Sequence, residues 1–189
     1  MHEEKEKLKS LLDATSKQET ERPVCAWLKE HPLVLARGVC VEGHPSVVAE
    51  FPLGNDYRAD FVALGPFSGG FDIHFCELEP PDSRLFTKDG KPASRLNGAM
   101  AQISEWKVFI EKNRPTLLHD LSKFFKEREL VIERGEEPTD HVGWHLYHPR
   151  VWLKFYYHII IGRRDGLSDA DIERKAAMTY TNNVDVLTY

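Results

Sequence analysis

Acidic side chains gather on two apolar segments whose spacing suits metal chemistry. The segments 57–64 (YRADFVAL) and 71–79 (FDIHFCELE) flank a glycine-containing turn at 65–70 (GPFSGG). If they pair as an antiparallel hairpin about the centre of that turn, the numbers of paired residues sum to about 137. The hairpin therefore predicts that Asp60 lies opposite Glu77.

The predicted hairpin has an apolar face that runs directly into three acids. Alternate residues of a strand share a face, so Asp60, Glu77 and Glu79 fall on the same side as the apolar residues of their strands. Carboxylates this close repel one another and lose hydration unless a cation neutralises them or their pKa values rise. Mg²⁺ and Mn²⁺ prefer such oxygen ligands. The pattern indicates a divalent-cation site, or else a solvated sheet edge at which Arg58 pairs with Glu79.

Gln102 is a polar residue at or beside the apolar stripe of the helix predicted over 94–113. It is either a structural hydrogen-bonding group or a group that points at the acids. The stripe follows helical spacing and consists of Leu96, Ala99, Ile103, Trp106 and Ile110.

The elements that must position these residues alternate between helical and strand patterns. Periodicity and turn residues predict an α+β fold with a mixed central β-sheet flanked by helices. The expected helices are 3–14, one from Pro23 that is interrupted near Pro32, 94–113, a second from Pro115 to about Arg128, and 168–178. The expected strands are 46–52, 57–64, 71–79, 151–161 and 184–188.

Composition limits the class of protein. The chain has 189 residues, 41% hydrophobic and 11% aromatic, which suits one globular domain with a substantial core. The net charge of −5 argues against a protein that coats nucleic acid non-specifically. No apolar run is long enough to span a bilayer and the N-terminus is too charged for a signal peptide, so we expect a cytoplasmic protein without membrane contact. Scattered Cys25, Cys40 and Cys76 indicate reduced core thiols.

Four segments together resemble the Shedu antiphage-defence nucleases (the DUF4263 domain), within the PD-(D/E)XK nuclease superfamily. The second and third carry the acids described above, and all four occur in the family's order over about residues 19–189. They are ERPVCAWLKEHPLVL (21–35), FPLGNDYRADFVAL (51–64), FCELEPPDSRLFTKDGKPASRLNGAMAQISEW (75–106), and HIIIGRR (158–164) with VLTY (186–189).

The resemblance implies a restriction-endonuclease-like domain over 19–189, preceded by a helical extension over 1–18. Asp60 and Glu77 would be metal ligands with the Leu78 carbonyl as a further ligand, Glu21 would complete the site, and Gln102 would border it. The cofactor would be a divalent ion, Mg²⁺ or Mn²⁺, the partner DNA, and the assembly a homo-oligomer (a dimer or a tetramer). The scissile phosphate would bind at the metal.

Glu79 departs from the family pattern, which has Lys at this position. That Lys orients the water or neutralises charge in the transition state, whereas Glu79 would be a second-metal ligand or a general base. Lys88, Lys107 and Arg84 are candidates for supplying the missing charge. The function implied is a metal-dependent endodeoxyribonuclease in phage defence; the alternative is a catalytically impaired nuclease-fold module that binds nucleic acid or mediates oligomer assembly.

Local basic clusters predict where DNA would bind. One lies in the segment after the third acid and also includes Lys91 and Arg95, and the other follows the apolar strand 151–161. From these clusters we predict four nucleic-acid-binding residues, Arg84, Lys88, Arg163 and Arg164.

Overall fold

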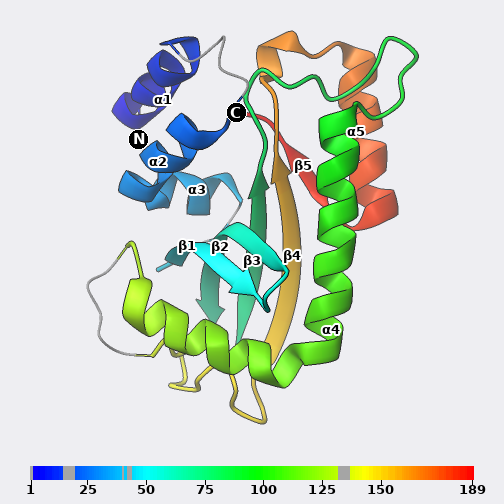
Figure 1. Cartoon of the computed structure of the whole chain (residues 1–189). Coiled ribbons are helices and arrows are strands. Elements are labelled where there is room, and N and C mark those ends of the chain that lie inside the picture. The colour runs from blue at the N-terminus through cyan, green and yellow to red at the C-terminus, as the bar shows by residue number, and fades with distance from the viewer. Residues whose placement is uncertain (1, 15–19, 40, 42–43, 132–136) are drawn as a thin grey trace.

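The fold is an α+β arrangement around one mixed sheet (Figure 1). The computed structural model describes residues 2–14, 20–39, 41, 44–131 and 137–189. Within these residues the strands are β1 (Ser46–Leu53), β2 (Tyr57–Phe67), β3 (Gly70–Leu78), β4 (Trp152–Ile160) and β5 (Asp185–Leu187). The helices are α1 (His2–Ala14), α2 (Arg22–Glu30), α3 (Pro32–Gly38), α4 (Ser94–Arg128) and α5 (Asp169–Asn182), with a 3₁₀ turn at Arg164–Gly166. The predicted fold class is confirmed.

The sheet changes from antiparallel to parallel at β3. Its order is β1-β2-β3-β4-β5, with β1, β2 and β3 antiparallel and β3, β4 and β5 parallel. The β2–β3 hairpin has the predicted register, with Val62 opposite Phe75 and Leu64 opposite Ile73. The carboxyl ends of β3 and β4 therefore meet at one end of the molecule.

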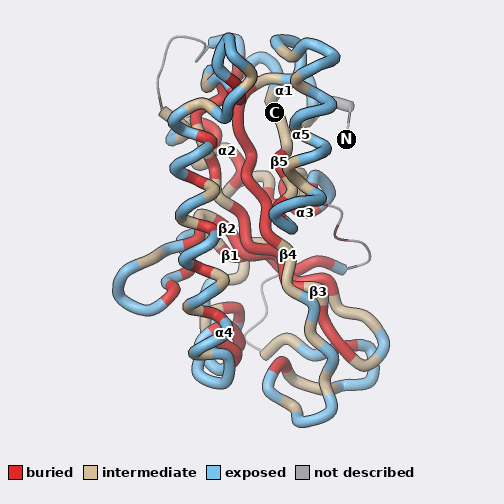
Figure 2. Tube along the Cα trace, turned by 90° about the vertical axis from the view of Figure 1, so that its right-hand side faces the viewer, coloured by how far each residue is buried: buried red, intermediate tan, exposed pale blue. Residues whose placement is uncertain are grey.

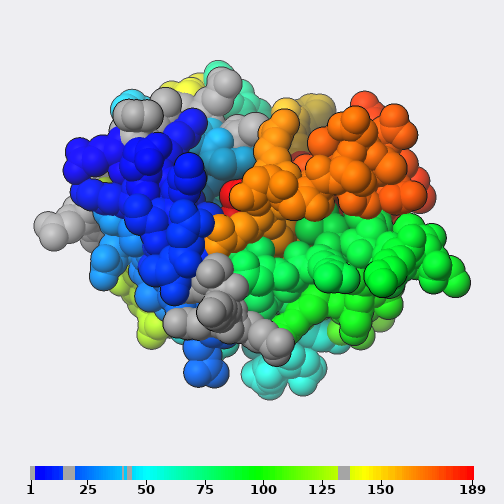
Figure 3. Space-filling model, turned by 90° about the horizontal axis from the view of Figure 1, so that it is seen from above, coloured from blue at the N-terminus to red at the C-terminus, as the bar shows by residue number. Residues whose placement is uncertain are grey.

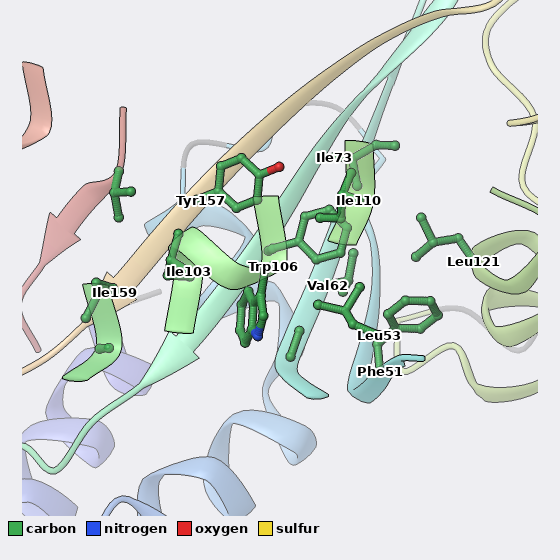
Figure 4. Packing of buried hydrophobic residues seen from close by; sticks show 14 of the residues in the cluster. Phe51, Leu53, Val62, Ile73, Ile103, Trp106, Ile110, Leu121, Tyr157 and Ile159 are labelled. Atoms are coloured by element: carbon green, nitrogen blue, oxygen red, sulfur yellow. The ribbon is translucent and has the colours of Figure 1, made fainter. Parts of the chain in front are cut away.

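Both faces of the sheet are buried, as Figure 2 shows by its central red strands between outer helices. α4 covers one face, where the fully buried Trp106 packs with Val62 and with Ile103 and Ile110 of its own helix (Figure 4). The helices α1, α2 and α3 cover the other face, with Val24 and Leu28 of α2 packed into a second cluster with Phe61. Because the central strands are buried on both faces, their sequences contain long apolar runs.

α4 runs along the sheet and then bends across its lower end (Figure 1). Two separate helices are predicted on either side of Pro115, and the structure joins them through a kink at Asn113, which has non-helical φ and ψ angles of −120° and 19°. Proline removes a backbone donor and clashes with the preceding turn. The Asn113 side chain donates to the Phe109 carbonyl at 2.9 Å and satisfies one of the interrupted groups.

The segment between β3 and α4 is an ordered loop. Pro80 and Pro81 follow the strand, the Ser83 N–H donates to the Pro80 carbonyl at 3.0 Å, and Leu85 is buried. Gly162, at the end of β4, has a φ of +66° and approaches this loop so closely that a Cβ would lie 2.6 Å from the Ser83 oxygen. Glycine is required there, and it fixes the path by which the chain returns to begin α4.

α5 continues four residues beyond the predicted end, to Asn182, because Asn183 closes it in a left-handed conformation with φ 51°. Cys25 and Cys76 are free thiols, with Cys76 buried, as predicted, whereas Cys40 lies outside the described residues. Among the described helices, none has the length and apolar character needed to cross a membrane.

Candidate functional site

Asp60 and Glu77 lie together where the β2–β3 hairpin ends. The ladder closes with Phe61 opposite Cys76, and continuing that register by one residue brings Asp60 opposite Glu77. The Leu78 N–H donates to Asp60 Oδ2 at 2.7 Å, which ties the first carboxylate to the strand of the second. The structure therefore brings together the two acids that the hairpin pattern predicts.

The Glu77 carboxylate is held without a compensating positive charge. Burial, followed by the charges of Asp60 and Glu79, raises its pKa to about 9, and hydrogen bonding by the Gln102 side chain opposes this rise. Its Oε2 atom is buried and has no hydrogen-bond partner among the described residues. An unpaired oxygen on a buried acid is costly, so this group is suited to bind a proton or a cation.

Glu21 and Glu79 complete a cluster of four acids with Asp60 and Glu77, which we call the acid cluster. Glu21 precedes α2, and its charge contributes to raised pKa values at the other three. Burial is the largest cause of the raised pKa of Asp60 and of Glu79. Glu21, at the residue before α2, and Glu79, which follows β3, thus lie within electrostatic reach of the Asp60–Glu77 pair.

Gln102 comes from α4 and faces the acid cluster, as one of its two predicted orientations requires. A cleft of about 480 Å³ opens between α4 and the β1–β2 turn. Gly98 is exposed on α4 beside this cleft, and a Cβ there would meet nothing within 4 Å. The residues lining the cleft include Arg58, Asp60, Glu77, Gly98, Gln102 and Glu105.

The donor set suits a hard divalent ion. Among the residues that the structure describes, no group of three or more His, Cys, Asp or Glu side chains could hold a metal ion, so they form no protein cage for a metal. Mg²⁺ does not need such a cage, because it keeps several waters and binds one or two carboxylates. Asp60 and Glu77 are the two carboxylates that fit this requirement, and the unpaired Glu77 oxygen is the observation in favour. A ligand role for the Leu78 carbonyl stays a prediction.

The Arg58–Glu79 ion pair of the solvated-edge alternative does not form. Arg58 Nη1 lies 3.9 Å from Glu50 Oε2, whereas Glu79 Oε2 lies 3.5 Å from Arg95 Nη1. Only 15% of the Glu79 side chain is exposed. Arg58 of β2 lies next to Glu50 of the neighbouring strand β1, whereas the partner of Glu79 comes from α4.

The residues predicted to bind DNA have different surroundings. Arg163 is engaged within the chain: its guanidinium lies 2.7 Å from Asp13 and 3.4 Å from Asp82, and it donates to the Leu12 carbonyl. This ties α1 to the loop after β3. Arg84, Lys88 and Arg164 are exposed, and DNA binding by the four residues stays a prediction.

Tyr189 is a site residue that the sequence reasoning did not single out. Its hydroxyl donates to the Glu79 carbonyl at 3.0 Å, and its N–H donates to the Gly162 carbonyl at 3.0 Å. Burial and the nearby charges of Asp60 and Glu21 raise its pKa well above the usual value. Tyr189 is the last residue of VLTY, one of the segments that resemble the family. That resemblance is the sequence signal for Tyr189, although VLTY contains no acidic residue.

Seen from the end at which β3 and β4 terminate, the N-terminal helices and α5 lie on opposite sides of the segment that follows β4 (Figure 3).

The chain matches one known family. A family described as the C-terminal region of the Shedu protein SduA matches residues 18–189.

The chain belongs to the Shedu family. Membership suggests a role in antiphage defence, the activity with which Shedu proteins are associated. A comparison with curated proteins gave no match. The family match spans every residue of the acid cluster, so the Shedu assignment and the site geometry concern the same part of the chain.

Proposed function

We propose that this Shedu family member is a metal-dependent endonuclease that hydrolyses phosphodiester bonds of DNA in antiphage defence. The observation that carries the proposal is the buried, unpaired Glu77 oxygen beside Asp60 at the wall of an open cleft. A buried acid pair of this kind needs a proton or a cation, and a cleft beside it admits a phosphate group.

The chain's own residues would prepare the site for that chemistry. Asp60 and Glu77 would hold the ion, which when bound would supply Lewis acidity and lower the pKa of its water. The Leu78 N–H fixes the Asp60 carboxylate, and Gln102 orients Glu77. The Glu79 side chain, of which 15% is exposed, faces Arg95.

We propose that the protein acts in the cytoplasm, where it would encounter phage DNA, and that it works as a homo-oligomer, a dimer or a tetramer. The second candidate function is a nuclease-fold module that binds nucleic acid or assembles without cutting. Glu79 favours this alternative because it adds negative charge where a phosphate would have to approach.

Cleavage assays separate the two functions. We expect the full chain to convert supercoiled plasmid and to shorten linear DNA in Mg²⁺ or Mn²⁺, and we expect EDTA to stop both reactions. Binding of the same DNA without cleavage in either metal, at protein concentrations that saturate the DNA, would favour the non-cutting module.

A further inference from the structure

Arg95 stands out because the acid cluster contains so little positive charge. The guanidinium of Arg95 lies 3.5 Å from Glu79 Oε2 and lowers the pKa of Glu79. Arg58 is near Asp60 but lies toward Glu50. In the part of the chain that the structure describes, Arg95 is thus the basic side chain that forms an ion pair with the acid cluster.

The position of Arg95 is built by the fold. The loop after β3 is closed by the Phe86–Pro92 bridge and by the Ala93 N–H, which donates to the Leu85 carbonyl at 2.8 Å. α4 begins at the next residue, Ser94, so the second residue of that helix is brought back beside the strand end from which the loop left. The fold thus fixes the backbone position of Arg95 next to Glu79.

Two of the basic side chains predicted for this role, Lys107 and Arg84, are engaged elsewhere or lie apart. Lys107 Nζ donates to the carbonyls of Asn182 and Asn183, at 2.7 and 3.0 Å, and lies 4.9 Å from the centre of the Tyr157 ring. Arg84 borders a different depression, which it shares with Asp165. Of these basic side chains, Arg95 is therefore the one that contacts Glu79.

We propose that Arg95 binds the phosphate group of DNA at this site and supplies the positive charge that a lysine at the position of Glu79 would otherwise supply. Half of its side chain is exposed, so the guanidinium can hold Glu79 and present further N–H donors to a phosphate. One divalent ion does not neutralise four carboxylates, and the added cation lets an anionic substrate approach. This inference rests on the proposed nuclease function.

The decisive test combines substitutions at the two paired residues. We expect Arg95→Ala to slow plasmid cleavage by about 100-fold. Arg95→Lys, which keeps a point charge but loses the planar fork, should fall between Arg95→Ala and the unaltered chain. Adding Glu79→Lys to the Arg95→Ala chain should restore most of the cleavage, because it returns an amino group to the same place.

A binding measurement without catalysis provides an independent readout. In EDTA, Arg95→Ala should weaken the binding of a DNA duplex and reduce the slope of log affinity against log salt by about one. Arg150→Ala is the matched control. Arg150 is an exposed arginine just before the first residue of β4, at the end of that strand away from the acid cluster, so its substitution should leave both the affinity and the salt slope unchanged.

The outcomes distinguish this inference from the nuclease proposal. If the unaltered chain cleaves DNA and Arg95→Ala cleaves it equally fast with an unchanged salt slope, Arg95 has no phosphate-binding role. Failure of the double substitution to recover any cleavage, in a folded protein, would also overturn the inference. A folded, unaltered chain that cuts no DNA in any metal contradicts the nuclease function itself.

Discussion

Asp60→Asn and Glu77→Gln should each reduce DNA cleavage by at least about 1000-fold, or about 4 kcal/mol of transition-state stabilisation. Each change removes one charged ligand oxygen at nearly constant volume. The fold should survive, because the two acids repel each other in the metal-free protein and the charge of Asp60 already raises the pKa of Glu77. Plasmid nicking rates and melting temperatures, measured on the same preparations, check both parts.

Glu111→Gln is the matched control for these substitutions. Glu111 is an exposed carboxylate further along α4, outside the acid cluster and the cleft, so its loss should change neither rate nor melting temperature. Normal cleavage by Asp60→Asn would show that the nuclease site is not here. A large drop in melting temperature for both variants would indicate that the acids serve the fold.

The metal-free protein should lose stability as the pH rises from about 7 to about 9, and Mg²⁺ should restore it. In the folded chain the pKa of Glu77 is raised to about 9 from an ordinary 4.5, mainly by burial. Between these values the folded state keeps a proton that the unfolded state has lost, so the free energy of unfolding falls with increasing pH. Raised pKa values at Asp60 and Glu79 act in the same direction.

The contribution of Glu77 alone to this slope is at most about 1.4 kcal/mol per pH unit, which amounts to several degrees of melting temperature over the window. Burial lowers the pKa values of His74 and His158 to about 4. Their effect on the free energy of unfolding has the opposite sign and is confined to pH values below about 6.5. Melting curves at three pH values, with and without Mg²⁺, measure the effect. Glu77→Gln should flatten the slope and abolish the Mg²⁺ response, whereas Glu111→Gln should keep both; a slope unchanged by Glu77→Gln would contradict the account.

The hairpin and its acids are predictable because they depend on local rules. A tight turn fixes the register, and strand alternation then fixes the face of every residue, so Val62 meets Phe75 as the turn centre requires. The apolar stripe of α4 likewise places Gln102 within reach of β3. These features follow from neighbouring residues and need no knowledge of distant contacts.

Arg95, Arg163 and Tyr189 show where local rules are insufficient. The contact of Arg95 with Glu79 depends on the path of the intervening loop, which has no periodic pattern. Two charged residues after an apolar strand favour a surface role, but Arg163 binds Asp13, 150 positions away in the chain. Tyr189 reaches Glu79 because β5 is parallel to β4 and delivers the end of the chain to the same edge.

If Asp60 and Glu77 together bind a divalent cation, a Mn²⁺ titration followed by electron paramagnetic resonance should detect it. The full chain should bind Mn²⁺, Mg²⁺ should compete for the same site, and Asp60→Asn and Glu77→Gln should each abolish this binding while Glu111→Gln retains it. Equal Mn²⁺ binding by the unaltered chain and by folded Glu77→Gln would show that the two acids do not form the cation site.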